Sequence, residues 1–270
     1  MYNVYRVYEA SYVFKFIQFL CVPWFMFAFL SEARGSETSL TYYVIEEQAR
    51  PFQISSGEGG YSGIASDLVE AIFAQSDISL NYETLPFRRM LRKMEQTRDS
   101  HWIALGSPEW QGIQAERLSK FPIFTAHHVA VVAKNVNPSQ TNISHLSELK
   151  SKHAILLFGF DYPGLAPFLK KQEMTRQFVK TYDSAFKLIQ RHPQESVFIE
   201  MELRVEHNLK RFSFPEDQIY SLDMSSVIPD YDIHLAYSPG LENGLVEMLD
   251  AEILKLKGNG QLEAIIARYR

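Results

Sequence analysis

The stretch that decides the fold begins with LTYYVI (40–45) and ends with GIASDLVEAI (63–72). Its first six residues are mostly aromatic or β-branched, which is typical of a strand. In the second part Ile64, Leu68 and Ile72 recur at every fourth position, so they share one face of a helix. A strand followed by a loop and a helix is the beginning of an α/β unit.

The loop between the strand and the helix holds four glycines, at Gly57, Gly59, Gly60 and Gly63. They lack the G-x-G-x-x-G spacing of a dinucleotide-binding loop and lie in a segment that also contains serines. We therefore expect a flexible turn there and no nucleotide cofactor.

The same alternation of strand and helix continues outward along the chain. Further strands are predicted at 78–82, 102–105, 128–133, 153–158 and 197–201. Helices are predicted to begin at Pro86, near Pro163 and at Asp183, and two more end the chain, at 241–256 and 262–269. Proline suits a first helical turn because its missing N–H is not needed there, and an aspartate can cap a helix. The alternation predicts an α/β fold rather than a sandwich or a bundle.

The composition is ordinary for a globular protein of 270 residues, with 46% hydrophobic and 22% charged residues and a net charge of −5. No stretch of Lys and Arg gathers enough charge to follow a phosphate backbone, which argues against a nucleic-acid-binding role. The eight histidines are scattered. His127 and His128 are adjacent, so on a strand they point to opposite faces and cannot share a metal ion. We expect no metal site and no cofactor.

The first thirty-three residues have the layout of a secretory signal. Arg6 and Lys15 precede an uncharged apolar run at 16–30, and the small residues Ser31 and Ala33 follow at the spacing that a signal peptidase recognises. We predict a signal peptide at 1–33, and the alternative is an uncleaved anchor. The run is short for a membrane helix, which favours cleavage.

The single cysteine, Cys21, lies inside that apolar run. A lipoprotein signal requires small residues before the cysteine, whereas Phe19 and Leu20 are bulky, so we expect no lipid anchor. After cleavage the chain would have no disulfide and no thiol nucleophile.

Four places along the remaining chain carry a resemblance to a known family. They are Arg50-Pro-Phe52 with Gly63-Ile-Ala-Ser-Asp67-Leu68, Leu85-Pro-Phe-Arg-Arg89, Glu116-Arg117 with Phe121-Pro-Ile-Phe124, and Lys257-Gly-Asn-Gly260 with Ile265, Ile266 and Arg268-Tyr269. In this order the chain resembles the family-3 extracellular solute-binding proteins, periplasmic receptors that mostly serve polar amino acid transporters.

The resemblance implies a two-lobed α/β fold of the type II periplasmic binding proteins, with two hinge crossings and a ligand cleft between the lobes. Lobe one is expected at 34–133 plus 228–270, and lobe two at 134–227. The polar segment 135–142 is the expected first crossing.

The resemblance also implies ligand-binding residues. Arg117 matches the arginine that grips the ligand carboxylate in relatives, a role that suits the guanidinium fork. Glu200 lies where relatives place an acid for the ligand ammonium. The alternatives are a surface arginine paired with Glu116 or Glu109, and a solvent-facing acid at a strand end.

Departures from the family pattern argue against an ordinary amino acid as ligand. Trp110 and Gly112 replace hydroxyl residues before the arginine, and Phe160 and Asp161 replace small hydroxyl residues in lobe two. Asp161 beside a ligand carboxylate is unfavourable. Trp110 and Phe160 suit a planar or cationic group, or they fill the core. We expect a cationic, zwitterionic or aromatic ligand.

Three further residues complete the expected ligand-binding set. Arg89 is expected at the cleft mouth, with a plain helix-surface arginine as the alternative. Phe52 and Glu47, which follow the first strand, are also expected to contact the ligand.

The resemblance predicts a monomeric, non-enzymatic periplasmic protein that closes around a small polar molecule and presents it to a membrane permease or sensor. The sequence does not separate transport from signalling. The alternative function is a periplasmic dehydratase acting on a cyclic carboxylic acid, with Glu200 or Asp161 as the acid and Arg117 as the anchor.

Overall fold

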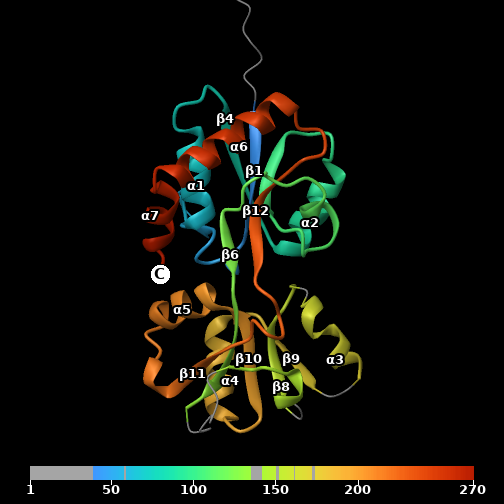
Figure 1. The fold of residues 1–270 in the computed structure, drawn as a ribbon, viewed down its shortest axis with the longest axis vertical. Coiled ribbons are helices and arrows are strands. Elements are labelled where there is room, and N and C mark those ends of the chain that lie inside the picture. The colour runs from blue at the N-terminus through green and yellow to red at the C-terminus, as the bar shows by residue number, and fades with distance from the viewer. Residues whose placement is uncertain (1–38, 58, 135–141, 150–151, 161, 172–173) are drawn as a thin grey trace, which may run out of the picture. The chain divides into compact units, whose positions relative to one another are not determined.

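The structure is a computed structural model that describes residues 39–57, 59–134, 142–149, 152–160, 162–171 and 174–270 (Figure 1). The predicted signal peptide at 1–33 lies outside the described residues. Within the described part of the chain, no helix combines the length and the apolar character needed to cross a bilayer.

The described residues form two five-stranded sheets, each with its own hydrophobic core. In the first sheet the strand order is β4-β1-β5-β12-β6; β1 runs parallel to β4 and β5, and β12 runs antiparallel to β5 and β6. The strands are β1 (Ser39–Ile45), β4 (Ser79–Leu85), β5 (Trp102–Gly106), β6 (Phe124–Ala126) and β12 (Tyr231–Tyr237).

Helices cover the first sheet, and the last helix of the chain lies beside the first (Figure 1). The predicted helix at Ile64 is confirmed, and Leu68 and Ile72 are buried in the core as expected. The predicted loop carries a short hairpin of β2 (Ile54–Ser55) and β3 (Tyr61–Ser62). The helices are α1 (Ile64–Phe73), α2 (Phe87–Gln96), α6 (Asn243–Gly258) and α7 (Gln261–Ala267), with a 3-10 turn η1 at Gly112–Ala115.

The second sheet has the order β11-β7-β10-β8-β9, with β8 parallel to β9 and β10, and β7 antiparallel to β10 and β11. Its strands are β7 (His128–Ala133), β8 (His153–Leu157), β9 (Thr175–Val179), β10 (Ser196–Met201) and β11 (Ile219–Asp223). Its helices are α3 (Ala166–Lys170), α4 (Tyr182–Arg191) and α5 (Glu202–Arg211), with 3-10 turns η2 (Leu146–Leu149), η3 (Pro163–Leu165) and η4 (Glu216–Gln218).

The strand β7 differs from the expected division of the chain. The expected lobe one extends through residue 133, but β7 pairs with β10 and β11 of the second sheet. The chain therefore passes between the sheets at His127, before β7, while the expected first crossing at 135–142 lies almost entirely outside the described residues. The apolar run of β7 correctly predicts a buried strand, but burial alone does not select the sheet that the strand joins.

The cap of α4 also differs from the prediction. Thr181 is the N-cap, and its hydroxyl accepts a hydrogen bond from the backbone N–H of Ser184, while Asp183 lies in the first turn. Both residue types are good caps, so the sequence does not choose between them.

The first and last parts of the family pattern meet at the start of α1. The Tyr269 hydroxyl accepts a hydrogen bond from Gly63 N (2.7 Å) and donates one to Asp67 Oδ2 (2.8 Å). Arg268 lies 3.0 Å from the same carboxylate. These residues hold the end of the chain on α1, so this part of the pattern has a structural role.

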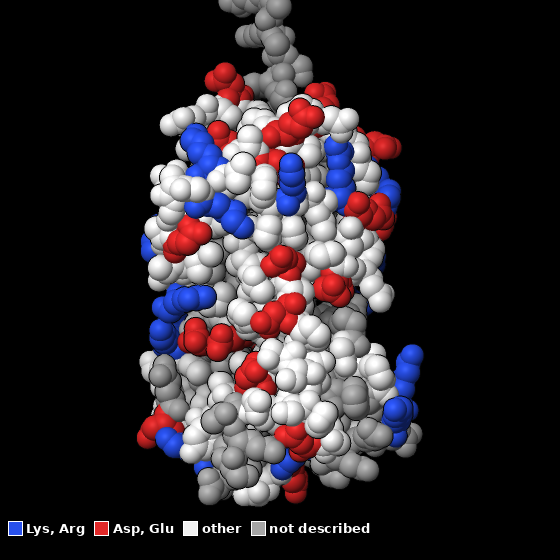
Figure 2. Space-filling view, viewed as in Figure 1, with Lys and Arg blue, Asp and Glu red and all other residues white. Residues whose placement is uncertain are grey.

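Charges of both signs are mixed on the face that Figure 2 shows, and the described residues form no continuous basic stripe there.

Candidate functional site

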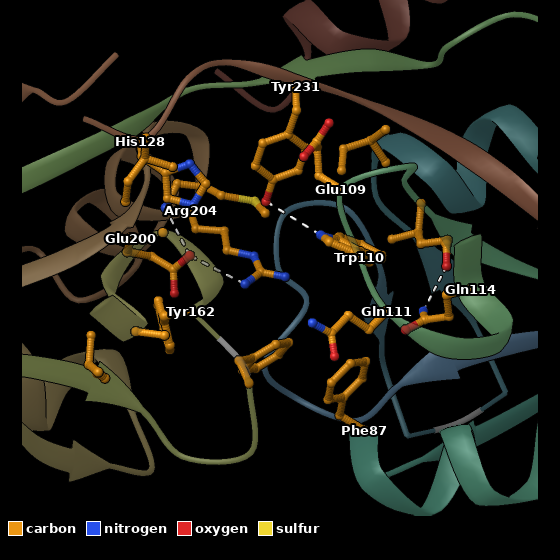
Figure 3. A pocket seen from close by; sticks show the side chains of 18 of the residues that line it. Phe87, Glu109, Trp110, Gln111, Gln114, His128, Tyr162, Glu200, Arg204 and Tyr231 are labelled. Carbon is orange, nitrogen blue, oxygen red and sulfur yellow. Dashed lines mark hydrogen bonds and ion pairs between the residues drawn. The ribbon is translucent and has the colours of Figure 1, made fainter. Parts of the chain in front are cut away.

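A cavity of about 830 Å³ is lined by residues from both sheets (Figure 3). This volume is within the usual range of small-molecule sites. The first sheet and its loops contribute Phe52, Phe87, Glu109, Trp110, Gln111, Gln114 and Phe124 among others. The second sheet and its helices contribute His128, Leu156, Phe160, Tyr162, Leu169, Met174, Glu200 and Arg204 among others. A molecule in this cavity would contact both sheets.

The polar centre of the cavity is a buried ion pair. Glu200 is near the end of β10 and Arg204 is in the first turn of α5, with Arg204 Nη1 3.3 Å from Glu200 Oε1. Their exposed fractions are 2% and 4%. Glu200 Oε1 also accepts the backbone N–H of Met201 (2.8 Å), and Oε2 accepts the Tyr182 hydroxyl (3.5 Å). Glu200 is therefore held in place by protein donors.

Aromatic rings contact the guanidinium of Arg204. Its Cζ lies 5.4 Å from the ring centre of Phe52 and 4.9 Å from that of Phe160, within the range of cation–π attraction. Its Nε has no hydrogen-bond partner. In Figure 3 the guanidinium extends from Glu200 toward Trp110 and Gln111. Arg204 thus combines a buried positive charge with an unused donor.

Burial shifts the protonation equilibria in this wall. The pKa of His128 is lowered to about 4 by burial and then by the charges of Arg204 and His127, so His128 is neutral near pH 7. The Nδ1 of His128 has no partner. Burial, reinforced by the negative charge of Glu200, raises the pKa of Tyr162 and Tyr182 well above the ordinary value, so both hydroxyls keep their protons.

Side chains from the two sheets also contact each other at the cavity. The ring of Phe87, beside the first sheet, stacks on the ring of Phe160, beside the second, with 4.9 Å between the ring centres. Near the rim, Gln48 Nε2 donates to the carbonyl of Phe158 at 3.2 Å. These contacts connect the two halves of the cavity wall.

Arg117, the expected carboxylate anchor, does not line this cavity. Its Nη1 donates to the carbonyls of Ser238 (3.3 Å), Pro239 (3.0 Å) and Leu241 (2.6 Å), and its Nη2 donates to Asn243 Oδ1 (2.7 Å). The guanidinium therefore holds the chain where it turns from β12 into α6. This arrangement does not fit the role expected for Arg117.

The other expected residues divide into two groups. Glu200, Trp110, Phe160 and Phe52 all line the cavity. Two others do not: Glu47 is exposed with its carboxylate 4.0 Å from Arg211, and Arg89 is exposed on α2. Asp161 lies outside the described residues.

The sequence analysis missed Arg204, His128 and Tyr231. The one local signal for Arg204 is its spacing of four residues from Glu200, which favours an ion pair when both lie on or near a helix. The tyrosine and the histidine have no such signal, because each reaches the cavity from a strand next to a crossing between the sheets.

The described residues hold no group of three or more histidine, cysteine, aspartate or glutamate side chains that could bind a metal ion.

No family model matches the chain, and no curated protein sequence matches it. Solved structures do match. The GluR0 ligand-binding core in complex with L-glutamate has a TM-score of 0.65 at 12% identity, with 86% of this chain and 97% of that chain covered. The amino acid transporter substrate-binding protein AbpA from Streptococcus pneumoniae, bound to L-arginine, has a TM-score of 0.65 at 16% identity, with 87% and 95% covered.

An ancestral amino-acid-binding protein, described as a precursor of cyclohexadienyl dehydratase, also matches. Its TM-score is 0.64 at 11% identity, with 86% of this chain and 94% of that chain covered. At these identities the likeness is one of fold. The chain has the two-lobed α/β fold of the periplasmic binding proteins, as predicted.

Proposed function

We propose that this chain is a binding protein that captures a small organic molecule in the cavity between its two lobes. The observation that carries the proposal is the cavity itself, because its wall is built from both sheets around the buried Glu200–Arg204 pair. In this proposal the lobes are residues 39–126 with 231–270, and residues 128–223.

A cavity wall built from both lobes suits a mechanism in which the ligand shifts the equilibrium between different relative positions of the two lobes. Two crossings join the sheets, one between β6 and β7 and one between β11 and β12. His127 and Asp230, one on each crossing, are in contact, with 2.7 Å between His127 Nδ1 and Asp230 Oδ2. A ligand that contacts both lobes favours the arrangement in which it makes more contacts.

The expected partner is a membrane transporter or a membrane sensor that recognises the ligand-bound form. Export to the periplasm is part of the proposal and rests on the apolar run and the small residues of 1–33.

The dehydratase alternative is weaker because of the surroundings of Glu200. A general acid must be able to reach the atom that it protonates. Arg204, Tyr182 and the Met201 N–H all donate to the Glu200 carboxylate, so protein donors already engage both of its oxygens. Binding without chemistry therefore fits the site better.

Thermal unfolding of the protein against a panel of small molecules tests the proposed function. The panel holds amino acids, polyamines, organic acids and aromatic amines. A ligand at about 100 times its dissociation constant stabilises the native state by about 2.7 kcal/mol, which raises the unfolding midpoint by several degrees. We expect at least one compound to do so in a dose-dependent manner. A flat response across the panel would count against a small-molecule receptor.

A further inference from the structure

The buried wall of the cavity has hydrogen-bond donors without acceptors. The guanidinium of Arg204 has five N–H groups, and its partners are Glu200 and Tyr182. Its Nε has no partner although it is buried. A buried donor without an acceptor is costly, so the site favours a ligand that supplies one.

Two hydroxyls add to the donors of this wall. Tyr162 accepts a hydrogen bond from Leu157 N at 3.0 Å, and Tyr231 accepts one from Trp110 Nε1 at 3.4 Å. Each hydroxyl keeps its own proton, because burial raises the pKa of both tyrosines. Both residues line the cavity. They can therefore donate to the same ligand group as Arg204.

The rings of Phe52 and Phe160 restrict how a ligand approaches Arg204. They contact the guanidinium at 5.4 and 4.9 Å, and Glu200 occupies Nη1. The part of the guanidinium that remains for a ligand is one edge of its plane, and the N–H groups along such an edge match the two oxygens of a carboxylate.

Among the described residues, the buried wall offers no comparable place for a ligand ammonium. The Glu200 carboxylate already accepts hydrogen bonds from Arg204, Tyr182 and the Met201 N–H, so an ammonium would compete with Arg204 and be repelled by it. Glu109 also lines the cavity, but its side chain is exposed, where water screens its charge. The other charged rim residues, Lys170 and Arg176, are positive.

The rest of the wall is suited to an apolar body. Leu156, Leu169, Met174 and Ile228 line it on the side of the second sheet, and Phe87 and Leu91 on the side of the first. Burial of apolar ligand surface against these side chains is favourable by roughly 25 cal/mol per Å².

We propose that Arg204, together with Tyr162 and Tyr231, binds the carboxylate of a small organic acid with an apolar body and no ammonium group. This inference rests on the proposed function and names the ligand class of that cavity. In it Glu200 is a positioning residue, which holds the guanidinium of Arg204, and does not contact a ligand ammonium.

Calorimetric titration with two matched series tests the ligand class on the unmodified protein. One series is hydrocinnamate, L-phenylalanine and phenethylamine, which share the same ring and chain. The other is isocaproate, L-leucine and isoamylamine. We expect at least one of the two carboxylates to bind at least about tenfold more tightly than its amino acid counterpart, because an unpaired buried ammonium is costly. Neither amine is expected to bind.

Variants of Arg204 test the anchor. Arg204→Lys keeps the charge and loses the fork, and we expect it to weaken binding of the carboxylate by about tenfold. Arg89→Lys is the matched control, since Arg89 is exposed outside the cavity. If Arg204→Lys does not fold, the double variant Glu200→Gln/Arg204→Gln removes both charges together and leaves no unpaired buried charge. Circular dichroism establishes that each variant is folded.

The outcomes separate this inference from the proposed function. Tighter binding of either amino acid than of its carboxylate overturns the inference and leaves the binding function intact. If neither carboxylate binds but other panel compounds do, the inference is likewise overturned and the binding function stands. A folded Arg204→Lys variant that binds the carboxylate like the wild type also overturns the inference. No binding of any compound counts against both proposals.

Discussion

Arg117 and Arg204 differ in their surroundings: protein acceptors surround the guanidinium of Arg117, whereas Arg204 lines the cavity with its Nε unpaired. The position of Arg117 in the family pattern led us to expect a ligand contact. The structure gives its guanidinium three backbone carbonyls and one side chain instead. A motif identifies the residue type and its place along the chain, while the acceptors that the side chain meets depend on how the following loop folds.

Replacement of Arg117 by alanine should therefore affect stability and not ligand binding. Several charge-assisted hydrogen bonds to carbonyls are lost, so we expect Arg117→Ala to lower the free energy of unfolding by about 2 kcal/mol. Urea denaturation measures this value. A folded Arg117→Ala protein that no longer binds the ligand would contradict this account and support the ligand-binding role that the family pattern implies for Arg117.

His128 should make stability depend on pH. Its pKa is about 4 in the folded protein, because of burial and the charges of Arg204 and His127, against about 6.5 for an ordinary histidine. Between these values the unfolded chain binds a proton that the folded protein does not, so stability falls as the pH drops. The loss approaches about 3 kcal/mol below pH ~4.

The His128→Gln variant isolates this contribution, since all other titrating groups remain. We expect the difference in unfolding free energy between wild type and variant to be constant above pH ~7 and to shift against the wild type by pH ~4. Denaturation curves across this range give the difference. Parallel pH profiles for the two proteins would show that His128 is not the group responsible.

Among the helices, α1 depends on a glycine that no other residue can replace. Gly63 has φ +108°, and a Cβ at this position would lie 2.7 Å from the carbonyl oxygens of Pro51 and Phe52. The backbone conformation and the close approach both exclude a side chain. The glycine that the sequence pattern singles out is thus required by packing.

We expect Gly63→Ala to destabilise the protein by about 2 kcal/mol or more, since the substitution adds strain to a steric clash. Gly244→Ala is the matched control, because Gly244 lies in α6 with open space around its Cα. Thermal unfolding should show a large drop in the midpoint for the first variant and little change for the second. Equal effects would contradict the packing argument.

Two helices show why the sequence predicts some elements and misses others. In α1 the period is simple and the prediction is confirmed. In α5 the buried set includes Arg204 and Asn208, which break that period, and the helix was missed. A functional polar residue on the buried face of a helix removes the pattern by which the helix is recognised.

For the molecule as a whole, the order of four short segments was enough to predict a two-lobed α/β fold, and the solved structures agree. Of the residues expected to bind the ligand, Glu200, Trp110, Phe160 and Phe52 line the cavity, and their contact with a ligand stays a prediction. The rest of the cavity wall depends on which residues of distant segments come together when the two sheets form. Spacing along the chain does not contain that information.

Titration of the best panel ligand into wild-type protein and a variant with a filled cavity tests whether the ligand binds between the two sheets. Ala166 lines the cavity on α3, and Ala166→Trp fills part of the space. Ala251→Trp, on the exposed face of α6, is the matched control. We predict that Ala166→Trp abolishes binding while Ala251→Trp binds like the wild type. Unchanged affinity in a folded Ala166→Trp protein would contradict binding in this cavity.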